Sequence, residues 1–295
     1  MALRTELVMG TRVSIDVVPP GGEAEIERAF GWFHEVEQIC SRFDERSELC
    51  RLSSQIGVAV PASAILFQSV KFALALAEET AGAFDPTVGY RMEEMGFHRN
   101  YQTGEQIRTS MAVEPGVSYR DVCLDENRRT ITLLRPLVLD LGAVAKGLAV
   151  DLAAKELRPL KDFSIDAGGD LYLGGSNHNA EPWRVGIRHP RLDGELIETL
   201  RVSNRAVCTS GDYERGRHIL DPRQGSPAGN IGNATAVASA TAVAPDAMLA
   251  DALATAAFVL GPLDGIALFE KMGVEGLIVT PGLIRYETRG LPRAA

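Results

Sequence analysis

The sequence is poor in cysteine, and the few cysteines that it has are widely separated. Cys40, Cys50, Cys123 and Cys208 include no CxxC pair. This scatter argues against a disulfide framework and a cysteine-ligated zinc site, and it favours reduced thiols that pack individually. A catalytic thiol at Cys208, beside Thr209, is the alternative that this stretch leaves open.

Positive charge and long apolar runs are also scarce. Lys and Arg total 30 against 39 Asp and Glu, which gives a net charge of -9. Binding to nucleic acid requires a basic face, and this sequence lacks one. DNA or RNA is therefore not expected as a partner. No segment reaches the length of a membrane span, and residues 1–18 lack the basic start and apolar run of a secretion signal. We therefore expect a cytoplasmic protein.

Apolar spacing along the chain indicates both helices and strands. The spacing is helical over residues 23–40 and 64–80, and polar and apolar residues alternate over residues 11–18, as in a strand. Three more helices are predicted at residues 143–157, 246–260 and 263–272. A hairpin is predicted at residues 121–134, a strand at residues 137–142 and a polar surface loop at residues 98–118. No repeat or linker stands out, so we predict one α+β domain over residues 1–295, with two lobes and mixed sheets flanked by helices.

The stretch LDLGAVAKG, residues 139–147, has features of an anion site. Asp140 ends the predicted strand, and Lys146 lies in the first turn of the predicted helix. Helix starts have free backbone N–H groups, and the small residues here let a phosphate approach them. The alternative is that Asp140 caps the helix while Lys146 is solvated.

Two glycine-containing stretches each have two alternative interpretations. Gly168 and Gly169 interrupt an apolar strand pattern, which favours a β-bulge, although close approach of a flat ligand would also exclude side chains. In AGAFDPTVG, Asp85 either closes a turn after a helix or lies beside a ligand that Phe84 flanks. Spacing alone does not separate these two alternatives.

One carboxylate in the predicted helix 246–260 stands among apolar residues. Asp251 and Thr255 are four residues apart and share a helical face. Asp251 is therefore predicted to lie near the interior, where a carboxylate needs a partner. Carboxylate and hydroxyl oxygens are the hard ligands that Mg²⁺ prefers, which favours a metal over the alternative of a surface Asp and a Thr bonded to its own helix.

The stretch TSGDYERGRHILDPRQG, residues 209–225, is unusually rich in polar groups. It contains His218, and the chain has only 5 histidines. Ser210, Asp212, Asp221 and further charged residues surround it in the sequence, a density that a structural loop rarely requires. His218 is a candidate general base or phosphate ligand near neutral pH.

Eight stretches in this order strongly resemble the ApbE-like FAD:protein FMN transferases. They are MGT, SRFDERSEL, GAFDPTVG, LDLGAVAKG, DAGGD, TSGDYER, HILDPRQG and ADALATAAFVLG, and together they span most of the chain. The resemblance implies an enzyme that binds FAD and Mg²⁺ and transfers FMN to a Ser or Thr hydroxyl of a target protein through a phosphoester bond, releasing AMP.

The resemblance also implies roles for individual residues. It implies Mg²⁺ ligands at Asp251, at Thr255 and at the main-chain oxygen of Ala143, and it makes His218 the candidate base. The FAD contacts that it implies are Met9, Ala83, Phe84, Asp85, Asp140 and Lys146.

Two departures from the family pattern bear on function. The connection between TSGDYER and HILDP is short, only Gly216 and Arg217, which alters the rim where a target protein would dock. No leader or lipobox is present, so a cytoplasmic flavin transferase or an FAD pyrophosphatase is expected. A non-catalytic FAD-binding protein is the alternative from another class.

Overall fold

The structure is a computed structural model and describes residues 3–106, 116–213, 219–228 and 236–294. Two compact units divide the chain. Unit 1 comprises Met1–Phe33, Lys146–Ile219 and Pro227–Ala295, and unit 2 comprises His34–Ala145 and Leu220–Ser226. Helices and sheets occur in each unit, which confirms the α+β class. One domain over residues 1–295 stays a prediction.

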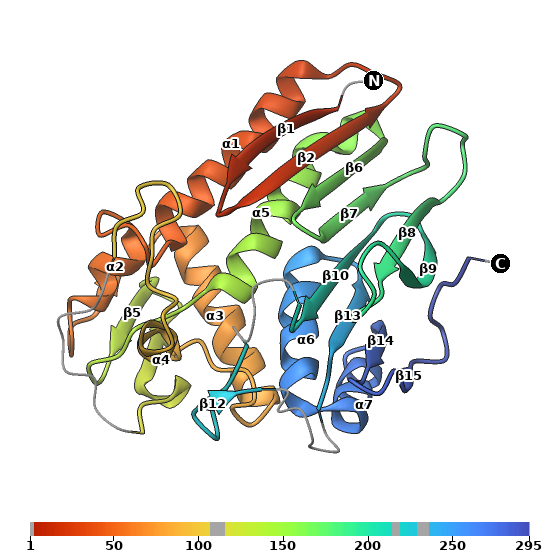
Figure 1. The fold of residues 1–295 in the computed structure, drawn as a ribbon. Helices are drawn as coiled ribbons and strands as arrows, with labels where there is room; N and C mark the ends of the chain where they lie inside the picture. Colours follow the sequence, from red (N-terminus) through yellow and green to blue (C-terminus); the bar gives the residue numbers. More distant parts are fainter. Residues whose placement is uncertain (1–2, 107–115, 214–218, 229–235, 295) are drawn as a thin grey trace. The chain divides into compact units, whose positions relative to one another are not determined.

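Unit 1 is built on an eight-stranded sheet whose neighbouring strands pair antiparallel (Figure 1). The predicted alternation over residues 11–18 is confirmed, because Val13, Ile15 and Val17 are at most 1% exposed. In spatial order the strands are β1 Arg4–Val8, β2 Thr11–Val18, β6 Asp162–Ala167, β7 Asp170–Gly174, β10 Arg205–Gly211, β13 Ser239–Ala244, β14 Glu275–Val279 and β15 Arg285–Glu287.

Two helices of unit 1 pack on this sheet (Figure 1). Helix α6, Ala247–Leu260, contacts β10 and β13, and α7, Pro262–Lys271, contacts β14. Both confirm helices predicted from apolar spacing. Helices α1, Glu23–Cys40, and α5, Gly142–Leu157, are also as predicted, and each contributes residues to both units. A 3₁₀ turn, η2, Arg158–Leu160, follows α5.

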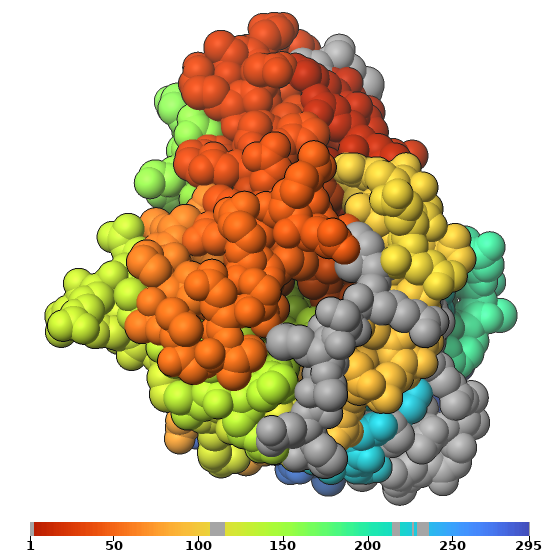
Figure 2. Space-filling view, turned by 90° about the vertical axis from the view of Figure 1, so that its left-hand side faces the viewer, coloured from red at the N-terminus to blue at the C-terminus, as the bar shows by residue number. Residues whose placement is uncertain are grey.

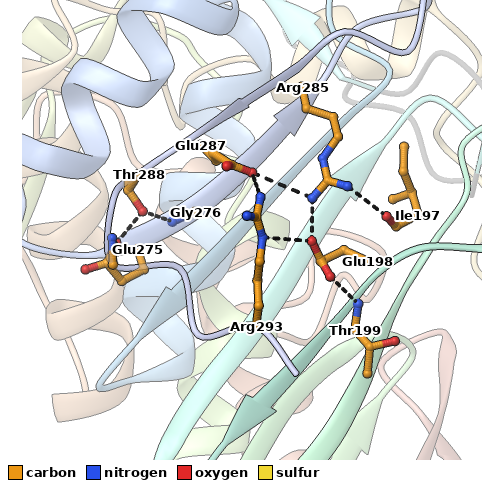
Figure 3. A network of polar contacts seen from close by, with 10 residues as sticks. Ile197, Glu198, Thr199, Glu275, Gly276, Arg285, Glu287, Thr288 and Arg293 are labelled. Atoms are coloured by element: carbon orange, nitrogen blue, oxygen red, sulfur yellow. Dashed lines mark hydrogen bonds and ion pairs between the residues drawn. The ribbon is translucent and has the colours of Figure 1, made fainter. Parts of the chain in front are cut away.

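A separate hairpin of unit 1 pairs β8, Trp183–Arg188, with β9, Leu196–Val202. A charged network joins β9 to β15 and to the chain's last described residues (Figure 3). Glu198 accepts hydrogen bonds from Arg285 and, at 3.0 Å, from Arg293, and Glu287 pairs with the same two arginines. None of these residues is a predicted site residue.

Unit 2 contains the helices α2 Glu48–Ser53, α3 Ala64–Glu79 and α4 Gly89–Glu94 and a 3₁₀ turn, η1, Tyr119–Asp121. Its three-stranded sheet has the order β3 Val60–Pro61, β5 Thr130–Leu133, β4 Val122–Asp125. The short strands β11 Leu220–Asp221 and β12 Ser226–Pro227 pair with each other. The helix predicted over 64–80 and the hairpin over 121–134 are confirmed.

The predicted loop over residues 98–118 is described only in part. Residues 99–106 are mostly exposed and lie on the surface that Figure 2 presents in yellow. Residues 107–115 lie outside the described part of the chain. None of the helices in the ranges that the structure describes has the length and apolarity needed to cross a bilayer.

Three expectations from the sequence are wrong or incomplete. Residues 137–142 form no strand, since Val138 makes only a single bridge, to Val88. Gly168 and Gly169 form the turn between β6 and β7 rather than a bulge; both have positive φ, and a Cβ on Gly168 would lie 2.0 Å from the Thr11 hydroxyl oxygen. The short elements β1, α2 and α4 carry too few residues for apolar spacing to reveal them.

Helix α6 is capped by a residue of another helix. Asp246 occupies its N-cap position but makes no side-chain cap hydrogen bond. Instead, the carboxylate of Asp151, in α5, accepts the N–H groups of Ala247 at 2.6 Å and Met248 at 2.9 Å. Free N–H groups at a helix start need such acceptors, so Asp151 performs the capping function.

The pH dependence of stability is expected to depend on Asp151. Burial raises the pKa of this carboxyl to about 7, although the two backbone N–H groups act in the opposite direction. The native state then holds a proton that the unfolded chain has lost, so this stabilisation is complete below about pH 4 and is lost as the pH rises through 7. Urea unfolding between pH 4 and pH 8 should show the wild type losing up to about 1.4 kcal/mol per pH unit relative to Asp151→Asn. Parallel curves for the two proteins would contradict this expectation.

Candidate functional site

Three charged side chains of unit 1 meet in a largely buried cluster. Lys146, from α5, pairs through Nζ with Oδ2 of Asp170, the first residue of β7. The same Nζ lies 3.9 Å from Oδ2 of Asp251, in α6. Asp170 is 2% exposed and Asp251 is 6% exposed, which confirms the predicted burial of Asp251. Two carboxylates and one ammonium leave this cluster with a formal charge of −1.

The hydroxyl group of Thr255 lies on the same face of α6 as Asp251, and a hydroxyl group of β10 lies beside it. Thr255 follows Asp251 by one helical turn, and its Oγ1 lies 3.0 Å from Oγ of Ser210, in β10. Uncompensated negative charge and hard oxygen donors fit a divalent cation such as Mg²⁺. Among the described residues no group of three or more His, Cys, Asp or Glu side chains could hold a metal ion. A Mg²⁺ site here would therefore also need hydroxyl or main-chain oxygens.

Asp170 and Ser210 complete this cluster, and neither was among the predicted site residues. In the GGD stretch the glycines interrupt the apolar strand pattern, and the interpretation from sequence rests on them alone. A usable signal was the acidic residue itself, since Asp170 opens the otherwise apolar segment DLYLG. Its partner Lys146 is 24 residues away in the sequence, and no spacing rule connects a helix start to a strand across that distance.

Asp140 lies in unit 2, and both of its carboxylate oxygens accept hydrogen bonds. Oδ1 accepts a hydrogen bond from the N–H of Gly142 at 2.8 Å, and Oδ2 accepts one from Nε–H of Arg42 at 2.5 Å. Arg42, with its side chain 5% exposed, also donates to the carbonyl of Phe97 at 2.6 Å. The alternative that Asp140 caps the helix start is thus what the structure shows, and a contact of Asp140 with FAD stays a prediction.

Asp85 closes a turn in unit 2 and borders a cavity. Oδ1 accepts both the N–H and the hydroxyl of Thr87, and Oδ2 accepts the N–H of Tyr119 at 3.0 Å. Burial raises the pKa of this carboxyl despite these hydrogen bonds. The neighbours Ala83 and Phe84 are buried at 1% and 6% exposure. Of the two alternatives for Asp85, the turn is therefore present.

The cavity beside Asp85 has a volume of about 480 Å³ and lies within unit 2. Its lining combines the acidic Asp85 and Glu94 with three guanidinium groups, Arg91, Arg120 and Arg223. Arg223 is also paired with Asp221 at 3.0 Å. Such a lining can accept a polar ligand that carries negative charge.

Met9, His218 and Cys208 are the other residues for which the sequence suggested a role. Met9 lies half-buried in the tight turn between β1 and β2, with a φ of 53°. His218 lies outside the described residues. Cys208 is not a reactive thiol, because its Sγ is wholly buried and donates to the carbonyl of Ala247, and burial raises its pKa well above the ordinary value.

The two units hold different members of the predicted ligand set. Asp251, Thr255 and Lys146 belong to unit 1, whereas Ala143, Asp85 and Asp140 belong to unit 2. The structure brings Lys146 close to Asp251 within unit 1. Joint metal binding by Asp251, Thr255 and the main-chain oxygen of Ala143 stays a prediction, as do the FAD contacts.

Comparison with known proteins gives consistent matches over most of the chain. The family model of the ApbE family matches residues 9–278. A Treponema pallidum protein named FAD:protein FMN transferase is 32% identical, with 94% of this chain and 84% of that protein covered. One of the same name from Haemophilus influenzae is 30% identical, covering 80% and 72%.

Solved structures show the same fold. The ApbE protein of Thermotoga maritima superposes with a TM-score of 0.84 at 30% identity, with 99% of each chain covered. The flavin transferase ApbE of Vibrio cholerae gives 0.83 at 26% identity, covering 97% of this chain and 96% of that one.

Proposed function

The chain belongs to the ApbE family, and from that premise we propose that it transfers FMN from FAD to a Ser or Thr hydroxyl of a target protein. The hydroxyl oxygen forms a new bond to the phosphorus of the FMN moiety, the bond from that phosphorus to the AMP oxygen breaks, and AMP leaves. The relatives named FAD:protein FMN transferase support flavin transfer. Dependence on Mg²⁺, the hydroxyl acceptor and AMP release belong to the proposal.

The cluster of Lys146, Asp170, Asp251, Thr255 and Ser210 is the observation that carries it. Cleavage of a diphosphate requires neutralisation of the charge on its oxygens, and Lys146 brings a full positive charge. Asp170 orients that ammonium group. Asp251 and Thr255 would hold Mg²⁺, together with the main-chain oxygen of Ala143 that the family resemblance implies. When bound, Mg²⁺ supplies further charge neutralisation at the phosphates.

The remaining roles come from the family resemblance. His218 would accept the proton of the attacking hydroxyl. Met9, Ala83, Phe84, Asp85 and Asp140 would contact FAD, and the cavity beside Asp85 is consistent with a ligand there. Positioning and charge dominate phosphoryl transfer in general, so the Lys146 cluster is expected to contribute more to the rate than the base does.

The test is incubation of the purified protein with FAD and Mg²⁺, with and without a candidate target protein. A flavin transferase releases AMP in step with a target that gains the mass of FMN. An FAD pyrophosphatase releases AMP and free FMN without a target, and a non-catalytic flavin-binding protein stays yellow and releases neither. Absence of both adduct and AMP with every divalent metal tried would refute the proposal.

A further inference from the structure

Helices α5 and α6 meet at two residues of α5 that lie one turn apart, Gly147 and Asp151. Both face the first two residues of α6, Ala247 and Met248. Neither was singled out from the sequence, and the proposed chemistry uses neither. Their position is nevertheless specific, because Lys146 directly precedes Gly147 and Asp251 follows Ala247 by four residues.

Gly147 allows the backbone of α5 to lie close to the start of α6. A Cβ at this position would lie 2.5 Å from the carbonyl oxygen of Ala247 and from Cα of Met248, and 2.6 Å from the Met248 nitrogen. All three are backbone atoms, which cannot swing aside as the end of a long side chain can. Any larger residue would therefore move α5 away from α6.

Asp151 holds the same point of α6 by hydrogen bonds. It accepts both the Ala247 and the Met248 N–H groups, across 96 and 97 residues of sequence. From the other side, the Cys208 thiol donates to the Ala247 carbonyl at 3.7 Å. The first residue of α6 is thus held at both its N–H and its C=O.

This contact joins α5 to α6 at one point along both helices. Each residue of helix advances the backbone by about 1.5 Å, so a small slip of one helix along the other changes the distance between Lys146 and Asp251 by a similar amount. That distance is 3.9 Å. Under the proposed function, such a slip would move the ammonium away from the groups that act with it on the diphosphate.

We propose that Gly147 and Asp151 are positioning residues that hold Lys146 of α5 in register with Asp251 and Thr255 of α6. The part of this inference that concerns catalysis rests on the proposed function. The part that concerns register is a property of the fold and is tested without activity.

The register is tested by double-mutant cycles in urea unfolding. Lys146→Met is combined with Gly147→Ala and, separately, with Asp151→Ala. If the contact places Lys146 in the cluster, the two substitutions of each pair should not act independently. The unfolding equilibrium constant of each double variant should then differ at least tenfold from the value obtained by multiplying the two single effects. Asp151→Asn, which removes the charge but keeps one acceptor oxygen, should show a smaller coupling. Multiplicative effects in both cycles would overturn the proposal.

The matched control is Ser63→Ala. Ser63 caps α3 by accepting the N–H of Leu66 at 3.2 Å, so its removal deletes a cap in unit 2, on a helix that carries none of the predicted site residues. Combined with Lys146→Met, it should give multiplicative effects. A coupling as large as that of Asp151→Ala would overturn the assignment of a specific register.

The catalytic part is tested by AMP release from FAD in the presence of Mg²⁺ and of a target protein that gains FMN. Asp151→Ala should lower kcat at least tenfold while KM for FAD changes less than threefold, Asp151→Asn should recover part of the loss, and Ser63→Ala should match the wild type. An unchanged kcat in Asp151→Ala would overturn this part. Coupling in the cycles with no AMP from the wild type, with FAD, Mg²⁺ and the candidate target proteins all present, would refute the proposed function while supporting the register, so the two failures are distinguishable.

Discussion

Replacement of Asp251 by Asn is expected to lower the rate of AMP release from FAD, measured with Mg²⁺ and a target protein present, by a factor of about 100 to 1,000. Asp251 carries a buried charge beside Lys146, and its burial means that little solvent screening weakens its interaction with a cation. An amide keeps the shape and one oxygen but removes the charge. The Mg²⁺ concentration needed for half-maximal activity should therefore rise together with the loss of rate.

The matched control for Asp251→Asn is Asp246→Asn. Asp246 precedes the same helix, is exposed and makes no side-chain cap hydrogen bond. It should leave both AMP release and its Mg²⁺ dependence unchanged. Wild-type kinetics in Asp251→Asn, or equal losses in the two variants, would remove the basis for placing a metal on α6. A chelator should abolish AMP release by the wild type, and added Mg²⁺ should restore it.

Replacement of Lys146 by Met is expected to abolish AMP release and also to destabilise the fold. The variant keeps most of the side-chain volume but leaves the Asp170 carboxylate, 2% exposed, without its ammonium partner. Removal of one partner from a buried ion pair costs about 3–5 kcal/mol. Urea unfolding would measure this loss, with Lys155→Met, an exposed position on the same helix, as the control.

A second substitution separates the two effects of Lys146→Met. In Lys146→Met combined with Asp170→Asn, no full charge remains at that pair, so most of the lost stability should return. AMP release should stay absent, because the charge that would neutralise the phosphates is still missing. If the double variant stayed as unstable as Lys146→Met, the Lys146–Asp170 pair would not be the source of the loss.

Several elements of the fold could be predicted from the sequence because their cause is local. Helix α1 has the predicted bounds Glu23–Cys40, and Ile26, Phe30 and Phe33 on its apolar stripe are at most 3% exposed. Short elements such as α4 and an irregular segment such as residues 137–141 could not, because a few residues define no period. Gly168 and Gly169 favour a bulge in the sequence but form a turn in the structure, because a turn and a bulge use glycine for the same reason, a positive φ.

Some features of the candidate site were also predictable from the sequence, whereas others required the structure. Burial of Asp251 and its shared face with Thr255 followed from helical spacing and from the apolar residues around them. The two carboxylate partners of Lys146, the guanidinium partner of Asp140 and the hydrogen bond from Tyr119 to Asp85 required the structure. Each joins residues whose separation follows no period, so no pattern along the chain records it.

The amino-acid sequence by itself determined the class of the fold, most of the long helices and the family, because these depend on periodic apolar spacing and on short motifs in a set order. Tertiary structure alone decided which acid neutralises Lys146 and which one caps α6. The physical reason is that a buried charge or a free N–H group is satisfied by whichever acceptor the packing brings within about 3 Å. That acceptor, Asp170 or Asp151, comes from a distant part of the chain.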